Sequence, residues 1–168
     1  MATYQSILLH IIFALLIAKD KATFDLSLRY HIQPDEYGLL TALVRSCRQW
    51  GMFFYPNMLV QYSSNAPLAL IWMNVGVTKR FGLALYKVCR ECTCSGKETR
   101  GELLSLADLS FSMPDSDDVW NAPPGEGSEI AQNVASQANL RDNIDPKEWI
   151  SEASTVLYDT RVDFDWIV

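Results

Sequence analysis

The stretch from Leu68 to about Arg90 constrains the fold more than any other part of the chain, because it predicts one long helix. Apolar residues recur along it at helical spacing, the pattern of a helix that buries one face. Gly76 and Gly82 each cost a helix about 1 kcal/mol relative to alanine, so one of them is expected to mark a kink or a close helix crossing. We expect Ile71, Val75, Phe81, Leu85 and Val88 in the core, and Lys79, Arg80 and Lys87 in solvent.

Two more helices are expected before the long one. The run from Tyr4 to Ala18 is apolar nearly all round, which predicts a helix buried between other helices, with His10 as a hydrogen-bonded core residue. Pro34 begins an amphipathic helix that continues to about Phe53. Its expected core residues are Tyr37, Leu40, Val44, Cys47 and Met52, and its expected exposed basic residues are Arg45 and Arg48.

Turn-forming segments divide the remaining chain into short pieces. Breaks are expected at residues 55–57 and 63–67, which contain proline. Asp145 and Pro146 are typical of the N-cap and first position of a helix, which we expect to continue to about Tyr158. No internal repeat and no strand ladder is visible in the sequence. The predicted fold class is therefore mostly α.

The charge distribution separates an expected domain from an expected tail. Residues 1–100 hold eleven Lys and Arg against six Asp and Glu, a net charge of +5, whereas residues 101–168 hold three against fourteen, a net charge of −11. A chain of 168 residues is long enough for one domain. We expect a single helical domain over residues 1–124 and an irregular acidic tail over residues 125–168, with a short helix near 146–158. Acidic tails repel phosphate, so this one is expected to meet a protein rather than nucleic acid.

The apolar run from Ile7 to Ala18 has a second interpretation, as a targeting segment of a small membrane-associated or secreted protein. Three details favour a core helix instead. No Lys or Arg precedes the run, His10 interrupts it, and Lys19 follows close to where a signal peptide would have small residues for cleavage. The run is also shorter than the ~20 residues that cross a bilayer as a helix.

No motif in the sequence predicts catalysis, a cofactor or a metal. Cys89, Cys92 and Cys94 raise the question of zinc, but structural zinc takes four ligands in paired spacings, and the pattern here is incomplete. Two histidines, His10 and His31, are too few and too far apart to support a catalytic arrangement. We therefore expect no enzyme. The basic residues of the long helix are interpreted as its solvated side, because a nucleic-acid footprint needs a larger cluster.

The end of the chain is the most suggestive stretch for partner binding. Acidic residues alternate there with large apolar ones, and the expected partner-binding residues are Asp163, Phe164, Asp165 and Trp166. This mixture is typical of disordered activation segments, in which carboxylates keep aromatic side chains in solvent and available to a partner's groove. The alternative is a last strand or helix whose aromatic residues return to the core.

Several segments together resemble the regulatory (middle homology) domain of fungal zinc-cluster and zinc-finger transcription factors. They are Trp72, the run from Lys79-Arg80 to Val88, the leucine-rich segment Leu103 to Leu109, and the turn from Met113-Pro114-Asp115 to Trp120. The resemblance covers about residues 37 to 124. The sequence begins at Met1 without the zinc-binding head of that family and departs from it in front of the basic pair, so we expect a truncated or diverged member.

The resemblance implies an all-helical regulator that acts in the nucleus. Its expected partners are the transcription machinery or a DNA-bound protein, and the helical body is expected to dock either on itself, as a homo-oligomer, or on that DNA-bound protein. Direct DNA binding by this chain alone and membrane association are not expected. In fungi such regulators often control clustered pathway genes, including those of secondary-metabolite biosynthesis.

Overall fold

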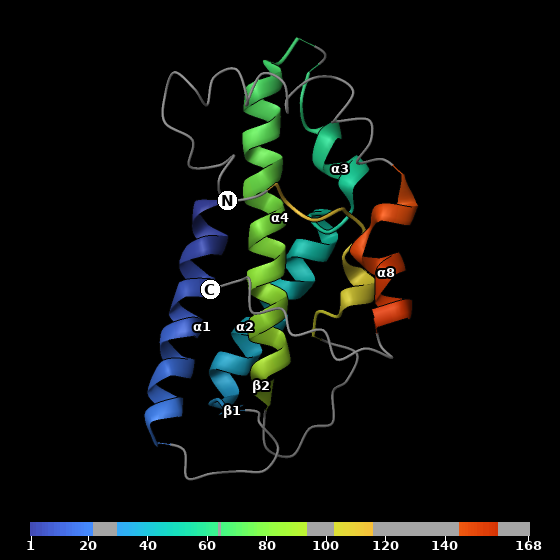
Figure 1. The fold of residues 1–168 in the computed structure, drawn as a ribbon. Coiled ribbons are helices and arrows are strands. Elements are labelled where there is room, and N and C mark those ends of the chain that lie inside the picture. Colours follow the sequence, from blue (N-terminus) through green and yellow to red (C-terminus); the bar gives the residue numbers. More distant parts are fainter. Residues whose placement is uncertain (22–29, 64, 94–102, 116–144, 158–168) are drawn as a thin grey trace. The chain divides into compact units, whose positions relative to one another are not determined.

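The computed structural model describes residues 1–21, 30–63, 65–93, 103–115 and 145–157, and in these residues the fold is mostly α-helical, as predicted (Figure 1). The chain divides into two compact units, one of Met1–Trp50 with Leu83–Ser105 and the other of Gly51–Gly82 with Leu106–Val168. The long helix α4, Leu68–Glu91, contributes to both units and has nearly the predicted bounds. The expected boundary between domain and tail, at residue 124, lies outside the described residues.

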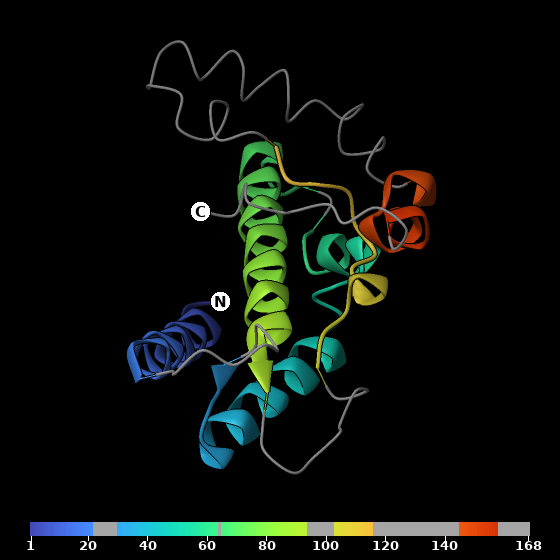
Figure 2. The same ribbon diagram turned by 60° about the horizontal axis from the view of Figure 1, so that its bottom comes forward.

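Among its described residues, the first unit contains two helices, a short strand pair and the last part of α4. The helices are α1, Ala2–Lys21, and α2, Pro34–Gln49. The strands are β1, Tyr30–His31, and β2, Cys92–Thr93, which pair in parallel and lie side by side at the end of α4 (Figure 2). Helix α1 packs against α2 and β1. Because β2 directly follows α4, this pair ties the end of the long helix to the segment that precedes α2.

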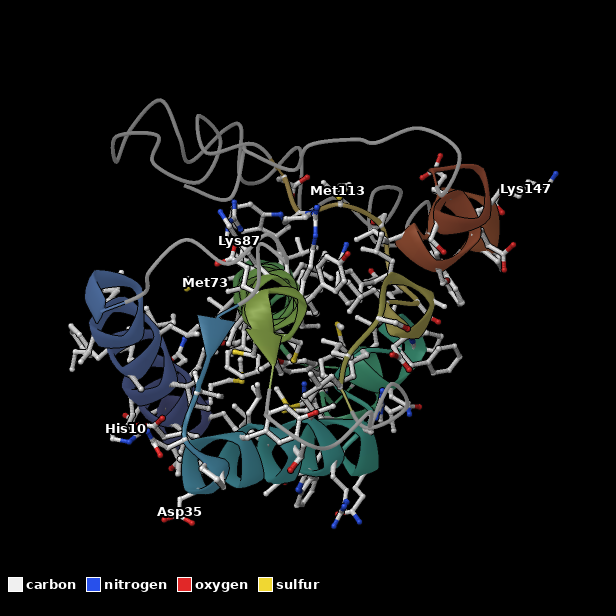
Figure 3. All side chains as sticks on the ribbon, turned by 90° about the horizontal axis from the view of Figure 1, so that it is seen from below. His10, Asp35, Met73, Lys87, Met113 and Lys147 are labelled. Carbon is white, nitrogen blue, oxygen red and sulfur yellow. The ribbon has the colours of Figure 1, made fainter. Side chains whose placement is uncertain are left out.

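Helix α1 is not buried on all sides, so the prediction that it lies between other helices is wrong. One stripe of α1 is buried, and it consists of Leu8, Ile11 and Leu15. The opposite face is exposed, and it carries Leu9, Phe13, Leu16 and Ile17. His10, labelled in Figure 3, is also exposed and is not a core residue. The physical reason is that α2 and β1 cover only one side of α1.

Helix α2 has the predicted start and core. Asp35 and Glu36 occupy its first turn, where they interact favourably with the helix dipole, and the backbone N–H of Gln33 donates to Glu36 Oε2 at 2.9 Å. Arg45 is exposed as predicted, whereas Arg48 is half-buried and donates from Nη2 to the Leu103 carbonyl at 3.0 Å. The buried residues are Tyr37, Leu40, Leu43, Val44 and Cys47. Four of these five were predicted, and Met52 lies beyond the end of the helix.

Gly51 follows α2 at the turn that ends it, with a φ of 64°, a left-handed conformation that favours glycine. A Cβ at this position would contact the side-chain amide nitrogen of Asn57 and lie 2.9 Å from its Cβ. We expect Gly51→Ala to lower the free energy of unfolding by about 1–3 kcal/mol, measured by chemical denaturation.

Gly38, inside α2, is the matched control for this prediction. An added Cβ there meets nothing within 4 Å, so Gly38→Ala is expected to stabilise the protein by about 0.5–1 kcal/mol. Equal effects at the two glycines would contradict the structural assignment of the turn at Gly51.

The second unit combines the first part of α4 with short elements. They are α3, Tyr55–Val60, the 3-10 turns η1, Leu106–Asp108, and η2, Pro146–Glu148, and the helix α8, Ile150–Leu157. The predicted break at 55–57 is instead the first turn of α3, where the fixed φ of Pro56 suits a helix start. The helix predicted from residue 146 is present in two pieces separated at Trp149, and Asp145 Oδ1 accepts from the Lys147 N–H at 3.0 Å as the predicted cap.

Helix α8 packs on η1, as Figure 1 shows for the red and yellow segments. The N–H groups of Ile150 and Ser151 donate to the carbonyls of Phe111 and Leu109, both at 3.0 Å. Trp149 and Ile150 are buried. A helix that the sequence placed in the tail is therefore part of the core of the second unit.

Within the described residues, α4 is the one helix long and apolar enough, by length and composition, to cross a membrane. In the stretch that meets this criterion, 44% is buried inside the fold. Gly82 lies at a close approach on this helix. A Cβ there would be 3.3 Å from Cζ of Phe111, which comes from a loop rather than from a crossing helix.

Candidate functional site

The most distinctive polar arrangement is centred on Lys79, in the middle of α4. Its side chain is 4% exposed, so the prediction that Lys79 faces solvent is wrong. The ammonium Nζ donates to Ser112 Oγ at 2.9 Å and lies 5.0 Å from the ring centroid of Tyr55. The loop after η1 causes this burial, because it runs along α4 from Gly82 back toward Trp72 and covers the helix face that carries Lys79.

Burial dominates the electrostatics of this cluster. It lowers the pKa of Lys79 from 10.5 to about 8, and the negative charge of Asp115 opposes the shift. Burial also raises the pKa of the Tyr55 hydroxyl from 10.0 to about 12, and Asp115 acts in the same direction. The cluster therefore holds an ammonium whose positive charge is stabilised by one hydroxyl, one aromatic face and one nearby carboxylate.

Asp115 joins the loop to α4 at two further points. Its Oδ2 accepts from the Trp72 indole Nε1 at 2.6 Å, and its backbone carbonyl accepts from Arg80 Nη2 at 2.7 Å. Arg80 is half-buried rather than solvated, and Lys87, labelled in Figure 3, is half-buried as well. Lys79 and Arg80 thus use their donors to hold the loop.

Ser112 and Lys79 have the chemical identity of a nucleophile and its base, since serine–lysine pairs serve that role in some hydrolases. Their side chains are only 9% and 4% exposed, however. A nucleophile must reach the substrate, and neither group reaches solvent to do so. The pair is therefore best described as a buried polar contact that fixes the loop on α4.

Three cysteines form a second cluster, in the first unit. Cys47, Cys89 and Cys92 are buried cysteines. Burial raises the pKa of Cys47 and of Cys92 from 9.0 to about 12, and the proximity of Cys89 contributes to both shifts. Their thiols are consequently poor nucleophiles at neutral pH. Across the described residues, no group of three or more His, Cys, Asp or Glu side chains is arranged to hold a metal, and Cys94 lies outside those residues.

The structure leaves the predicted partner-binding residues untested. Asp163, Phe164, Asp165 and Trp166 lie outside the described residues. Comparison of the chain with protein-family models, with curated proteins and with solved structures found no match. The functional assignment therefore depends on the residues of this chain and on the resemblance described above.

Sequence reasoning missed Tyr55 and Ser112 as members of the Lys79 cluster. One signal was available for Lys79 itself: it lies four residues after Val75 and three before Gly82, and such spacings share a helix face. Both neighbours are buried. For Ser112 no periodic signal existed, because it lies in an irregular loop.

Proposed function

We propose that the protein is a transcription regulator, similar to the regulatory domain of fungal transcription factors, that acts in the nucleus through protein contacts. The helical body provides a scaffold, and the acidic tail engages the transcription machinery or a DNA-bound partner. Control of a secondary-metabolite gene cluster is the pathway role that the resemblance suggests.

One observation supports this proposal most directly. Two parts of the chain that carry the family resemblance, helix α4 and the loop around Met113-Pro114, lie far apart in the sequence but meet in the second unit. Trp72 donates to Asp115, Lys79 donates to Ser112 beside the Met113-Pro114 turn, and Arg80 donates to the Asp115 carbonyl. These residues therefore have one structural role together, which is to attach the loop to α4.

The same contacts argue against a role in binding nucleic acid. A phosphate-binding face needs Lys and Arg donors in solvent, where they replace counterions. Lys79 is buried and Arg80 is half-buried against the loop, so the basic pair offers no such face. The net charge of −11 over residues 101–168 would also repel a phosphate backbone.

A reporter assay tests the proposed activity. The full chain, and separately residues 141–168, are fused to a neutral DNA-binding domain in a fungal cell. Both fusions are expected to raise transcription, and Phe164→Ala with Trp166→Ala is expected to remove most of the effect, because the aromatic side chains are the groups that a partner's groove would bury. Thr160→Ala is the control, since it leaves the acidic and aromatic residues in place. Inactive fusions, or fusions indifferent to the aromatic residues, would reject the mechanism.

A second candidate function, a membrane-associated or secreted protein, is favoured by the exposed apolar side chains of α1. The location of the full chain with a C-terminal fluorescent tag separates the two candidates. Nuclear accumulation supports the regulator. Signal in the secretory pathway or at a membrane would instead identify residues 7–18 as a targeting segment.

A further inference from the structure

Ser105 is exposed in the segment that leads into η1, and acidic residues flank it in the sequence. Asp108 follows it by three residues, and Glu102 precedes it by three. Protein kinases select their substrates partly by the charges around the target hydroxyl, and one class of serine kinases requires an acidic side chain at the third position after it. The segment Ser105-Leu106-Ala107-Asp108 meets that requirement.

Burial separates Ser105 from a second serine with the same spacing. Ser112 is also followed by an aspartate at the third position, Asp115. Its side chain is only 9% exposed, however, and its Oγ accepts from Lys79 Nζ at 2.9 Å. Among the serines and threonines that the structure describes, these two alone have an acidic residue at this spacing. Of the two, Ser105 is the one whose hydroxyl a kinase can reach.

A guanidinium is held close to Ser105 within the first unit. Arg48 of α2 donates from Nη2 to the Leu103 carbonyl at 3.0 Å. Leu103 is two residues before Ser105, so their Cα atoms are at most about 7 Å apart. A phosphoserine side chain and a guanidinium can together bridge that distance. Arginine is well suited to hold a phosphate, because its planar set of N–H donors matches the phosphate oxygens.

We propose that Ser105 is a phosphorylation site and that Arg48 binds the phosphate added there. In the reaction, Ser105 Oγ attacks the γ-phosphorus of ATP held by the kinase. A bond forms between Oγ and phosphorus, the bond from phosphorus to the bridging oxygen breaks, and ADP leaves. The hydroxyl proton passes to the catalytic aspartate of the kinase.

The phosphate changes the local charge and the contacts of this segment. It brings a charge of about −1.5 to −2 at pH 7 and three acceptor oxygens. With Arg48 it forms a charge-assisted contact that adds to the hydrogen bond from Arg48 to the Leu103 carbonyl. Phosphorylation therefore holds the segment before η1 more firmly on α2. This effect does not depend on whether the chain regulates transcription.

Treatment of the full chain with ATP and a serine kinase of this acid-directed class tests the site, and mass spectrometry of its peptides locates the phosphate. Ser105 is expected to be modified at least about 10-fold faster than Ser112, because access to Ser112 requires local opening of the fold. Ser105→Ala should lose this phosphate. In a synthetic peptide of residues 102–116, where nothing buries Ser112, the preference for Ser105 should disappear.

A ³¹P NMR titration tests the contact with Arg48. The resonance that is missing from treated Ser105→Ala belongs to this phosphate, whose second pKa is about 6 in a solvated phosphoserine. Arg48→Gln is expected to raise this pKa by about 0.5, because a nearby guanidinium favours the dianion. Arg45→Gln, an equal loss of charge at an exposed position of α2, is the matched control and should change it by less than half as much. Glu102 and Asp108 are present in all these proteins, so their opposing effect cancels in the comparison. Far-UV circular dichroism checks that the variants are equally helical.

Two results would overturn the proposal. One is a full chain in which the kinase leaves Ser105 unmodified, or modifies Ser112 as fast as Ser105. The other is a phosphate on Ser105 whose pKa responds to Arg48→Gln no more than to Arg45→Gln. The kinase result depends only on the wild type and on Ser105→Ala, a change at an exposed position, so it decides the site even if Arg48→Gln does not fold.

Discussion

Replacing Phe111 with alanine is expected to lower the free energy of unfolding by about 3–5 kcal/mol. The Phe111 side chain is fully buried, with its Cζ 3.3 Å from the position that a Cβ on Gly82 would occupy. Alanine would leave a cavity between the loop and α4 that the close backbone of Gly82 cannot fill. Since domains of this size are stable by about 5–15 kcal/mol in total, the loss is a large fraction of the whole. Chemical denaturation measures it.

Phe54 provides the matched control in the same unit. It is 40% exposed and forms an edge-to-face contact with Trp149, with ring centroids 5.5 Å apart. Phe54→Ala is expected to cost only about 0.5–1.5 kcal/mol. If both substitutions cost the same, Phe111 would not be the core residue that the structure describes.

The protein is expected to become more stable relative to a Lys79→Met variant as the pH rises from about 8 to about 10. Burial lowers the pKa of Lys79 to about 8, whereas in the unfolded chain it is near 10.5. Between these values the unfolded state holds a proton that the folded state has lost, so stability rises with pH. The gain in the free energy of unfolding is complete above the pKa of Lys79 in the unfolded chain, and it is lost as the pH falls through the pKa of Lys79 in the folded protein. Between the two values the free energy of unfolding rises by at most about 1.4 kcal/mol per pH unit.

Other buried groups act in the opposite direction at higher pH. The raised pKa values of Cys47 and Cys92, and that of Tyr55, mean that stability decreases above their unfolded values of 9.0 and 10.0. The net profile of the wild type alone would mix these effects. The difference between wild type and Lys79→Met cancels the contributions of Cys47 and Cys92, which belong to the first unit. Tyr55 lies beside Lys79, so the comparison is made below pH 10.0, where the Tyr55 hydroxyl is mostly protonated in both the folded and the unfolded state.

Two variants make the Lys79 prediction sharper. Ser112→Ala removes the hydrogen-bond partner of Nζ but keeps the lysine, so it should retain a rise with pH. Asp115→Asn removes the charge that raises the pKa of Lys79, so the rise should begin at lower pH. A ¹³C NMR titration of the lysine Cε resonances measures the pKa directly. A Lys79 resonance that titrates above pH 10 would contradict the buried position.

The periodic segments were predicted well because periodicity is a local property. The bounds of α4, the start and core of α2, and the Asp145 cap all follow from side-chain spacing and from the chemistry of helix ends. The mostly α fold class follows from the same patterns. The end of α2 was predicted too late, because Gly51 terminates the helix through its left-handed conformation, which composition alone does not locate.

Long-range packing decided the rest. The sequence by itself determined which segments are helical and which of their faces are apolar, since both depend on residues close together in the chain. Only the tertiary structure decided which apolar or charged face is covered. Lys79 was expected in solvent because it is charged, but the loop at Ser112 buries it. Phe13 and His10 were expected in the core because they lie in an apolar run, but among the described residues no second neighbour covers their side of α1, and both are exposed. Burial depends on the partner that arrives from elsewhere in the chain, and helical spacing carries no information about that partner.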